Sequence, residues 1–275
     1  MMKYKLLVSD FDNTLLRSDG TVSRDTLDAI RKYQSLGGKF LICTGRMFAS
    51  IRREARLLGI SGDVIAYNGG IVGDIDTGEI KYQSLIPLDI ALEIVDYLES
   101  RGKIVHLYIN DTLYINKANP YTDYYCKVCK VQATPVGNLV EYLGAVKICP
   151  TKILLIDEPS EIDKYSDILA SKGVGRYHVA KSAPNLLDIE GYGTSKGVAI
   201  KHIASLYGID ATECVCFGDS PNDISMLKVA GVGVAVDNAT DEVKKVADYI
   251  TDSCDRDGVK KVLDKIIRGT FYDKQ

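Results

Sequence analysis

Short, nearly continuous apolar runs alternate with longer amphipathic runs along the first third of the chain. An apolar run of four to six residues predicts a strand buried on both faces, as in a parallel sheet, and apolar positions at helical spacing predict helices. The strands are expected at 4–9, 40–43 and 64–67, and the helices at about 24–36 and 48–58. Ser23 is a predicted N-cap and Gly37 a predicted helix stop. This order predicts right-handed βαβ units and a sheet covered by helices on both faces.

The pattern changes after Pro87 and returns near Ser195. Between these points, paired strands with alternating side chains lie beside helices, which is typical of an α+β arrangement. The strands of this middle section are expected at 105–109, 112–115, 152–156, 175–180 and 186–189, and its helices at 88–100, around 121–125 and at 160–170. After it, helices are expected from Ser195 to Tyr207 and at 224–229 and 259–267, with strands at 214–217, 232–236 and 249–250.

The sequence therefore predicts an α/β fold. Residues 1–84 and 191–275 would form a doubly wound, Rossmann-like core with a parallel sheet. Residues 85–190 would form an α+β module inserted into that core. An apolar/polar pattern on both sides of Asp76-Thr77-Gly78 also predicts a hairpin turn there.

Composition excludes several classes of partner. The chain has 275 residues, of which 46% are hydrophobic and 26% charged, and its formal net charge is −3. No basic stripe suggests a nucleic-acid partner, and no run approaches the roughly 20 apolar residues of a membrane span. The apolar run 6–8 ends at Ser9, so no signal sequence is expected, and the seven cysteines fit a reducing cytoplasm. Cys126 and Cys129 are interpreted as structural, and the three dispersed histidines argue against zinc.

Three polar clusters follow directly after predicted strands. They are Asp10-Phe11-Asp12-Asn13-Thr14, Thr44-Gly45-Arg46 and Gly218-Asp219-Ser220-Pro221-Asn222-Asp223. Each alone would be an ordinary turn, since Asp, Asn, Gly and Ser are common in loops. Parallel strands end at one edge of their sheet, where ligands bind, so the clusters are expected to meet around one crevice.

Crowded carboxylates repel one another unless a cation lies among them. Oxygen ligands without nearby cysteine or histidine favour Mg²⁺, which commonly shares its ligands with a substrate phosphate. Lys196 lies at the start of a predicted helix that is capped by Thr194 or Ser195. The N-terminus of a helix already favours anions, and the lysine adds positive charge there. The constellation therefore predicts phosphoryl chemistry.

These residues resemble the four motifs of the haloacid dehalogenase superfamily, in the family's order and over essentially the whole chain. The inserted module and Asn68-Gly69-Gly70 resemble the Cof-like sugar-phosphatase branch, which usually has Asn-Gly-Ala there and a large α+β cap. The resemblance implies a role for each matching residue. Asp10 would be the nucleophile and a metal ligand, and Asp12 would be the general acid and base and bind the metal through its carbonyl. Asp219 would be a metal ligand, and Asp223 would lie in or just behind the ligand shell. The phosphate-binding residues would be Thr44, Gly45, Lys196 and Asn222.

An acid at position 12 favours hydrolysis over accumulation of the intermediate. We therefore expect a Mg²⁺-dependent phosphatase that hydrolyses small phosphomonoesters, such as sugar phosphates, through an aspartyl phosphate on Asp10. A cap would exclude large substrates, and its tyrosines (Tyr108, Tyr114, Tyr121, Tyr124 and Tyr125) are either structural or selective for the substrate. A phosphosugar mutase with the same motifs and a non-catalytic metabolite-binding protein remain alternatives. The sequence does not fix the oligomeric state.

Overall fold

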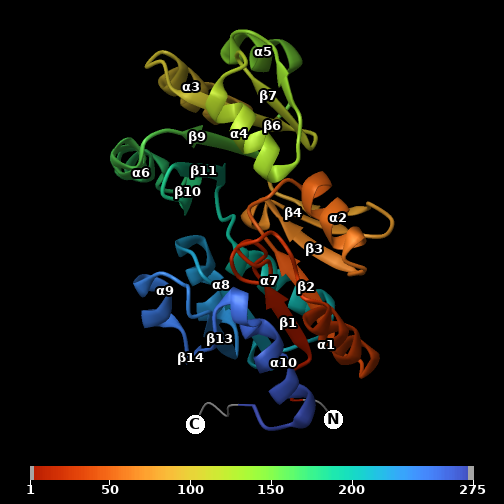
Figure 1. Ribbon diagram of the computed structural model, residues 1–275. Helices are drawn as coiled ribbons and strands as arrows, with labels where there is room; N and C mark the ends of the chain where they lie inside the picture. The colour runs from red at the N-terminus through yellow and green to blue at the C-terminus, as the bar shows by residue number, and fades with distance from the viewer. Residues whose placement is uncertain (1–2, 272–275) are drawn as a thin grey trace.

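The computed structural model describes residues 3–271, which form two β-sheets, each with its own helices (Figure 1). The larger sheet has eight strands in the order β14-β13-β12-β1-β2-β3-β4-β5. Its strands are β1 (Leu6–Ser9), β2 (Lys39–Cys43), β3 (Asp63–Ala66), β4 (Ile71–Asp74), β5 (Ile80–Gln83), β12 (Cys214–Gly218), β13 (Val232–Ala235) and β14 (Tyr249–Ile250). Neighbours from β14 to β3 are parallel, and β4 and β5 are added antiparallel.

Helices cover both faces of this larger sheet. They are α1 (Arg24–Ser35), α2 (Phe48–Leu57), α7 (Lys196–Leu206), α8 (Ile224–Val229), α9 (Asp241–Val246) and α10 (Gly258–Arg268). Successive side chains of a strand point to opposite faces. Accordingly, Leu7 packs in the apolar cluster that includes α1, α2 and α10, and its neighbours Leu6 and Val8 pack in the cluster that includes α7, α8 and α9. Burial on both faces explains why these strands are apolar throughout.

The second sheet has six strands in the order β10-β11-β9-β6-β7-β8. Its strands are β6 (Ile104–Ile109), β7 (Thr112–Ile115), β8 (Ala133–Pro135), β9 (Lys152–Ile156), β10 (Tyr177–Ala183) and β11 (Leu186–Gly191). Its helices are α3 (Leu88–Glu99), α4 (Pro120–Cys129), α5 (Leu139–Val146) and α6 (Pro159–Gly173). We call these strands and helices the inserted module. They occupy the upper part of Figure 1, with α4 directed towards the larger sheet.

The two faces of the inserted module's sheet differ in chemistry. Leu107, Ile153 and Leu155 lie in an apolar cluster with residues of α3, α5 and α6. The alternate positions of β9 and β11 include Lys152, Asp188 and Glu190, which are also buried but contact the residues that follow the larger sheet's strands. This second face, which also carries the apolar Leu154 and Ile156, is therefore the contact of the smaller sheet with the rest of the chain.

The predicted fold class is confirmed, and so are most of the predicted elements. Ser23 accepts a hydrogen bond from the Thr26 amide as the predicted N-cap, and β4 and β5 form the predicted hairpin. Three elements were missed, namely β8, α5 and α9, because runs of three to eight residues are too short to show a clear period. The division of the chain into domains at residues 84/85 and 190/191 stays a prediction.

Candidate active site

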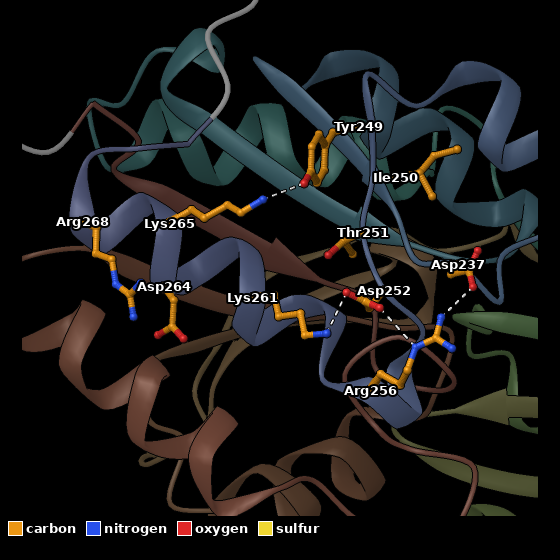
Figure 2. A pocket seen from close by; sticks show the side chains of 10 residues that line it. All are labelled: Asp237, Tyr249, Ile250, Thr251, Asp252, Arg256, Lys261, Asp264, Lys265 and Arg268. Carbon is orange, nitrogen blue, oxygen red and sulfur yellow. Dashed lines mark hydrogen bonds and ion pairs between the residues drawn. The ribbon is translucent and has the colours of Figure 1, made fainter.

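A hollow lies between β14 and α10, and several of its charged side chains pair with one another (Figure 2). Arg256 pairs with Asp237 and Asp252, and Lys261 also pairs with Asp252. None of the residues predicted for the site lines this hollow.

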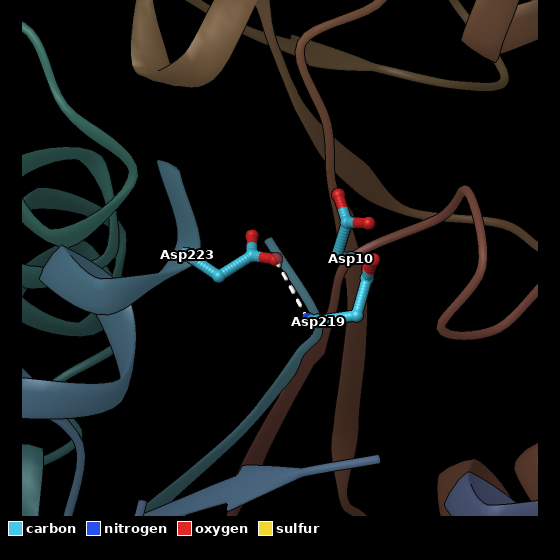
Figure 3. Close-up of side chains that lie close together, drawn as sticks. All are labelled: Asp10, Asp219 and Asp223. Atoms are coloured by element: carbon cyan, nitrogen blue, oxygen red, sulfur yellow. Dashed lines mark hydrogen bonds between the residues drawn. The ribbon is translucent and has the colours of Figure 1, made fainter. Parts of the chain in front are cut away.

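The predicted acidic residues meet where β1 and β12 end (Figure 3). Asp10 follows β1, and Asp219 follows β12, its parallel neighbour. Asp223, in the short turn after β12, extends its side chain towards them. Each of these three buried residues offers one carboxylate oxygen, and the three oxygens lie within 4.8 Å of one another. The parallel sheet thus brings together residues more than 200 positions apart in the sequence.

Local hydrogen bonds hold the loop after β12 in place. Asp223 Oδ2 accepts from the backbone amides of Asp219 and Ser220, both at 2.9 Å. Asp219 in turn accepts from the hydroxyls of Thr14, at 2.7 Å, and Ser220, at 2.9 Å. Asp223 therefore shapes the loop as well as contributing charge, so one residue serves two purposes at this sheet edge.

Lys196 is buried against two of the carboxylates. Its Nζ lies 2.5 Å from Asp10 Oδ1 and 2.6 Å from Asp223 Oδ1. Ser195 caps α7 by accepting from the Val198 amide, and this fixes Lys196 as the first helical residue. Burial opposes the charge of the amine, but the carboxylates of Asp10 and Asp223 outweigh it and raise the pKa of Lys196 well above its usual value. Lys196 is thus a fixed cation beside Asp10.

The donor set fits a divalent cation. Three carboxylates face one ammonium group, so negative charge is in excess. Burial raises the pKa of Asp10 well above its usual value, although Lys196 opposes this, and burial together with Asp223 raises the pKa of Asp219 to about 6. A cation bound among these carboxyl groups favours their ionised form and so displaces their protons. The oxygen-only donors suit Mg²⁺.

Asp12 lies apart from this acidic cluster and pairs with Arg46, a residue to which the sequence analysis gave no role. Arg46 donates to both carboxylate oxygens, from Nε at 2.8 Å and from Nη2 at 2.6 Å. Its guanidinium also lies over the Phe11 ring, 5.0 Å from the centroid. The Asp12 side chain remains 45% exposed and lines the cavity. A role for Arg46 could have been predicted from the sequence, because Arg46 directly follows Thr44-Gly45 in the second polar cluster.

The remaining predicted residues line one cavity of about 540 Å³ above the acidic cluster. Its floor includes Asp10, Asp12, Thr44, Gly45 and Asn222. Lys196, Asp219 and Asp223 do not line it but contact the floor residues or their neighbours. The structure therefore brings together every residue that the sequence predicted for the site.

The roof of the cavity comes from the inserted module. Its lining residues lie on α4, β9, β10, β11 and the turn between the last two: Tyr121, Tyr124, Tyr125, Val128, Cys129, Lys152, Leu154, Ile156, Ser182, Ala183, Asn185, Leu186 and Asp188. Of the other two tyrosines considered, Tyr108 is buried and donates to the Tyr125 hydroxyl, and Tyr114 stacks with Tyr142. Cys129 is a free thiol whose pKa is raised by burial.

Lys152 and Asp188 were missed by the sequence analysis. Both are almost fully buried, and they form an ion pair of 3.1 Å at the roof of the cavity. A polar side chain at alternate positions of an otherwise apolar strand is the signal that could have revealed them.

Comparison with known proteins agrees with this geometry. A family model described as haloacid dehalogenase-like hydrolase matches residues 7–263. The chain belongs to this family. The predicted Cof-like haloacid dehalogenase membership is confirmed, and the chain is a hydrolase of the phosphatase type. Among the residues 3–271, no helix is both long and apolar enough to cross a membrane.

Two relatives from Bacillus subtilis and one solved structure illustrate the similarity of this dehalogenase-like hydrolase to phosphatases. Phosphatase YwpJ is 29% identical, over 96% of this chain and 100% of its own length. The 5-amino-6-(5-phospho-D-ribitylamino)uracil phosphatase YitU is 28% identical, over 94% of this chain and 96% of its own. The structure of the subclass IIB sugar phosphatase BT4131 is 25% identical with a TM-score of 0.82, covering 97% of this chain and 100% of that one.

Proposed function

We propose that the protein is a Mg²⁺-dependent phosphatase that hydrolyses small phosphomonoesters through an aspartyl phosphate on Asp10. The observation that carries the proposal is the position of Asp10. Its carboxylate lines the cavity floor, is paired with Lys196, and lies within reach of the same ion as Asp219 and Asp223. A carboxylate nucleophile in this setting can approach a negatively charged phosphate ester.

Asp10, Asp219 and Asp223 would hold the Mg²⁺, together with the Asp12 carbonyl. The ion would supply positive charge that reduces the repulsion between Asp10 and the substrate. Thr44, the Gly45 amide, Lys196 and Asn222 would bind the phosphate oxygens. Each of these groups lines the cavity or contacts a residue that does.

The reaction would proceed in two displacements. Asp10 attacks phosphorus as the bond to the leaving alkoxide breaks, and Asp12 gives that alkoxide a proton. Water then attacks the phosphorus of the aspartyl phosphate, and Asp12 takes a proton from it as the bond to Asp10 breaks. Arg46 donates to both oxygens of Asp12 and so orients the ionised carboxylate that takes the proton from water. In the first displacement Asp12 carries the proton on one oxygen, and that oxygen faces the leaving group in place of Arg46. Phosphate and alcohol leave, and the enzyme returns to its starting state.

The cavity supports a small substrate. Its volume of about 540 Å³ and its roof from the inserted module suit a metabolite and disfavour a folded protein. Its polar groups and tyrosine rings would contact a sugar or a similar polar leaving group. Since relatives include a sugar phosphatase and a phosphatase for a ribityl-linked uracil, we propose sugar phosphates or comparable small esters as substrates. The seven free thiols favour action in the reducing cytoplasm.

The test is a screen of the purified protein with Mg²⁺ against phosphorylated metabolites. The set should include hexose 1- and 6-phosphates, the ribityl-linked uracil phosphate and a phosphoprotein. We expect free phosphate from one or more small esters and little from the phosphoprotein. Conversion of a hexose 1-phosphate to its isomer without net phosphate release would favour a mutase. Tight binding of one metabolite without turnover on any would favour a non-catalytic protein.

A further inference from the structure

Three buried polar residues of the inserted module, Lys152, Asp188 and Glu190, contact Gly45 or Asn68 beside the proposed phosphate-binding residues. Lys152 on β9 lies opposite Glu190 on β11 in the sheet, and Asp188 precedes Glu190 by two residues on the same face. All three are at most 2% exposed. Lys152 Nζ donates to the Gly45 carbonyl at 2.9 Å, and both carboxylates accept from the amide of Asn68.

Asn68 lies in a turn that is built at a conformational cost. Tyr67 and Asn68 both have left-handed backbone angles, with φ of 51° and 52°, which is unfavourable for tyrosine in particular. In this turn the Tyr67 amide donates to the Arg46 carbonyl and the Asn68 amide to the Thr44 carbonyl. A Cβ atom at Gly45 would lie 3.0 Å from Asn68 Oδ1. The turn therefore supports the whole Thr44-Gly45-Arg46 loop.

The chemistry of these contacts fixes which way the Asn68 amide points. The Asp188 carboxylate, which is paired with Lys152, accepts hydrogen bonds only, so Asn68 must present its Nδ2 there, at 2.9 Å from Asp188 Oδ2. The same Nδ2 lies 2.6 Å from Glu190 Oε1. Asn68 Oδ1 is then directed to Asn222. That oxygen accepts only, so Asn222 must present its own Nδ2, at 3.0 Å.

We propose that Asn68 is a positioning residue through which Asp188 and Glu190 of the inserted module orient the Asn222 amide for phosphate binding. The inference rests on the proposed function. Asn222 Nδ2 carries a second hydrogen, and Asn222 lines the cavity, so this hydrogen is available to a phosphate oxygen. Asn222 Oδ1 is buried and has no hydrogen-bond partner among the described residues, so nothing else on Asn222 fixes its orientation.

Through the same contacts, the affinity of the site for phosphate would depend on whether the inserted module is docked against the larger sheet. When the module is docked, Asp188 is shared between Asn68 and Lys152, and Lys152 holds the Gly45 carbonyl. Both phosphate-binding elements, the Gly45 peptide and the Asn222 side chain, are then oriented from one set of buried side chains. Undocking would release both at once.

The test is a double-mutant cycle read out as the affinity for inorganic phosphate, a product that has no leaving group. The first change is the isosteric pair Asp188→Asn with Glu190→Gln, and the second is Asn222→Ala. Phosphate affinity is measured in Mg²⁺ by competitive inhibition or calorimetry. We expect the loss of phosphate affinity caused by the pair to be about 5- to 10-fold greater when Asn222 is present than when it is alanine, because the part of the loss that runs through Lys152 and the Gly45 peptide is the same in both backgrounds. An equal loss in both backgrounds, or no loss, overturns the inference.

A second measurement uses the unaltered protein, in case the pair variant does not fold. The side-chain amide signals of Asn68 and Asn222 are followed by NMR as inorganic phosphate is added with Mg²⁺. We expect both to shift, because the two amides are linked by a hydrogen bond. An Asn68 signal that stays fixed while Asn222 shifts overturns the proposed coupling but leaves the phosphatase assignment intact. If the protein neither binds phosphate nor hydrolyses any ester, the proposed function fails and the inference with it.

Discussion

Arg46 holds both carboxylate oxygens of Asp12, at 2.8 and 2.6 Å. The pair joins the loop after β1 to the loop after β2, and the guanidinium is buried over the Phe11 ring. A planar guanidinium that donates two parallel hydrogen bonds fixes both the position and the rotation of its partner. The side chain that we propose as general acid and base is thus oriented before substrate arrives.

Replacing Arg46 should therefore lower the rate of chemistry more than substrate binding. We expect Arg46→Ala to reduce kcat by roughly 10- to 100-fold with a smaller change in KM. Arg46→Lys should recover only part of the loss, because a point charge cannot hold both oxygens. Arg176→Ala is the matched control, since Arg176 forms a similar two-bond pair with Glu93 on the exposed surface. Equal effects of Arg46→Ala and Arg176→Ala on kcat would refute the positioning role.

Mg²⁺ should stabilise the folded protein through the buried acidic cluster. Asp10, Asp219 and Asp223 face one ammonium group, so an added cation removes repulsion. We expect millimolar Mg²⁺ to raise the free energy of unfolding by about 1 to 3 kcal/mol, and chelation to abolish turnover reversibly. Asp219→Asn should reduce the stabilisation strongly, whereas Asp237→Asn, an exposed control, should leave it unchanged. Thermal unfolding with and without Mg²⁺ measures this, and equal stabilisation of both variants would contradict it.

Glu190 should make stability fall as pH rises. Burial, then the nearby Asp188, raises the pKa of Glu190 to about 8 despite Lys152, Asn68 and Lys196. Between about pH 4.5 and 8, the folded state keeps a proton that the unfolded state releases, so the free energy of unfolding decreases across this window and levels off above it. Glu190→Gln removes this dependence.

The difference in stability between Glu190→Gln and the unaltered protein is the quantity to measure. As pH rises from 5 to 8, we expect the free energy of unfolding of the variant to increase, relative to that of the unaltered protein, by on the order of a few kcal/mol. Denaturant unfolding at several pH values measures this, with the exposed Glu79→Gln as control. A difference that is constant with pH would show that Glu190 has an ordinary pKa.

Tyr124 should contribute to recognition of the leaving group and not of the phosphate. It lines the roof of the cavity although its side chain is 70% exposed. We expect Tyr124→Ala to raise KM about 3- to 10-fold and to leave inhibition by inorganic phosphate unchanged. Tyr192→Ala is the control, because Tyr192 is similarly exposed, at 68%, but is not among the residues that line this cavity. A parallel loss of phosphate inhibition in Tyr124→Ala would contradict the assignment.

Residues that follow a strand or begin a helix could be predicted from the sequence. Asp10 and Asp219 each come directly after a short apolar run, and Lys196 comes directly after a capping serine. Parallel strands bring such positions to one edge whatever the rest of the chain does. Hence the arrangement of the acidic cluster follows from local patterns and topology alone.

Residues that depend on how the inserted module docks could not be predicted in the same way. Lys152, Asp188 and Glu190 alternate with apolar residues on two strands, but the sequence does not say what their polar face contacts. Asn68 was noted only as part of a family-like motif, and its hydrogen bonds reach residues more than 100 positions away. Similarly, α5 is only eight residues long, and its amphipathic pattern is too brief to separate from a loop.

The central claim is that the Asp10 carboxylate receives the phosphoryl group. The most direct test compares the turnover of Asp10→Asn with that of the unaltered protein, on the best substrate and in Mg²⁺. Asparagine keeps the shape of the side chain but is a poor nucleophile. The account predicts that turnover falls by about 10³-fold or more while the variant stays folded and still binds the substrate. Turnover that survives the substitution would contradict it.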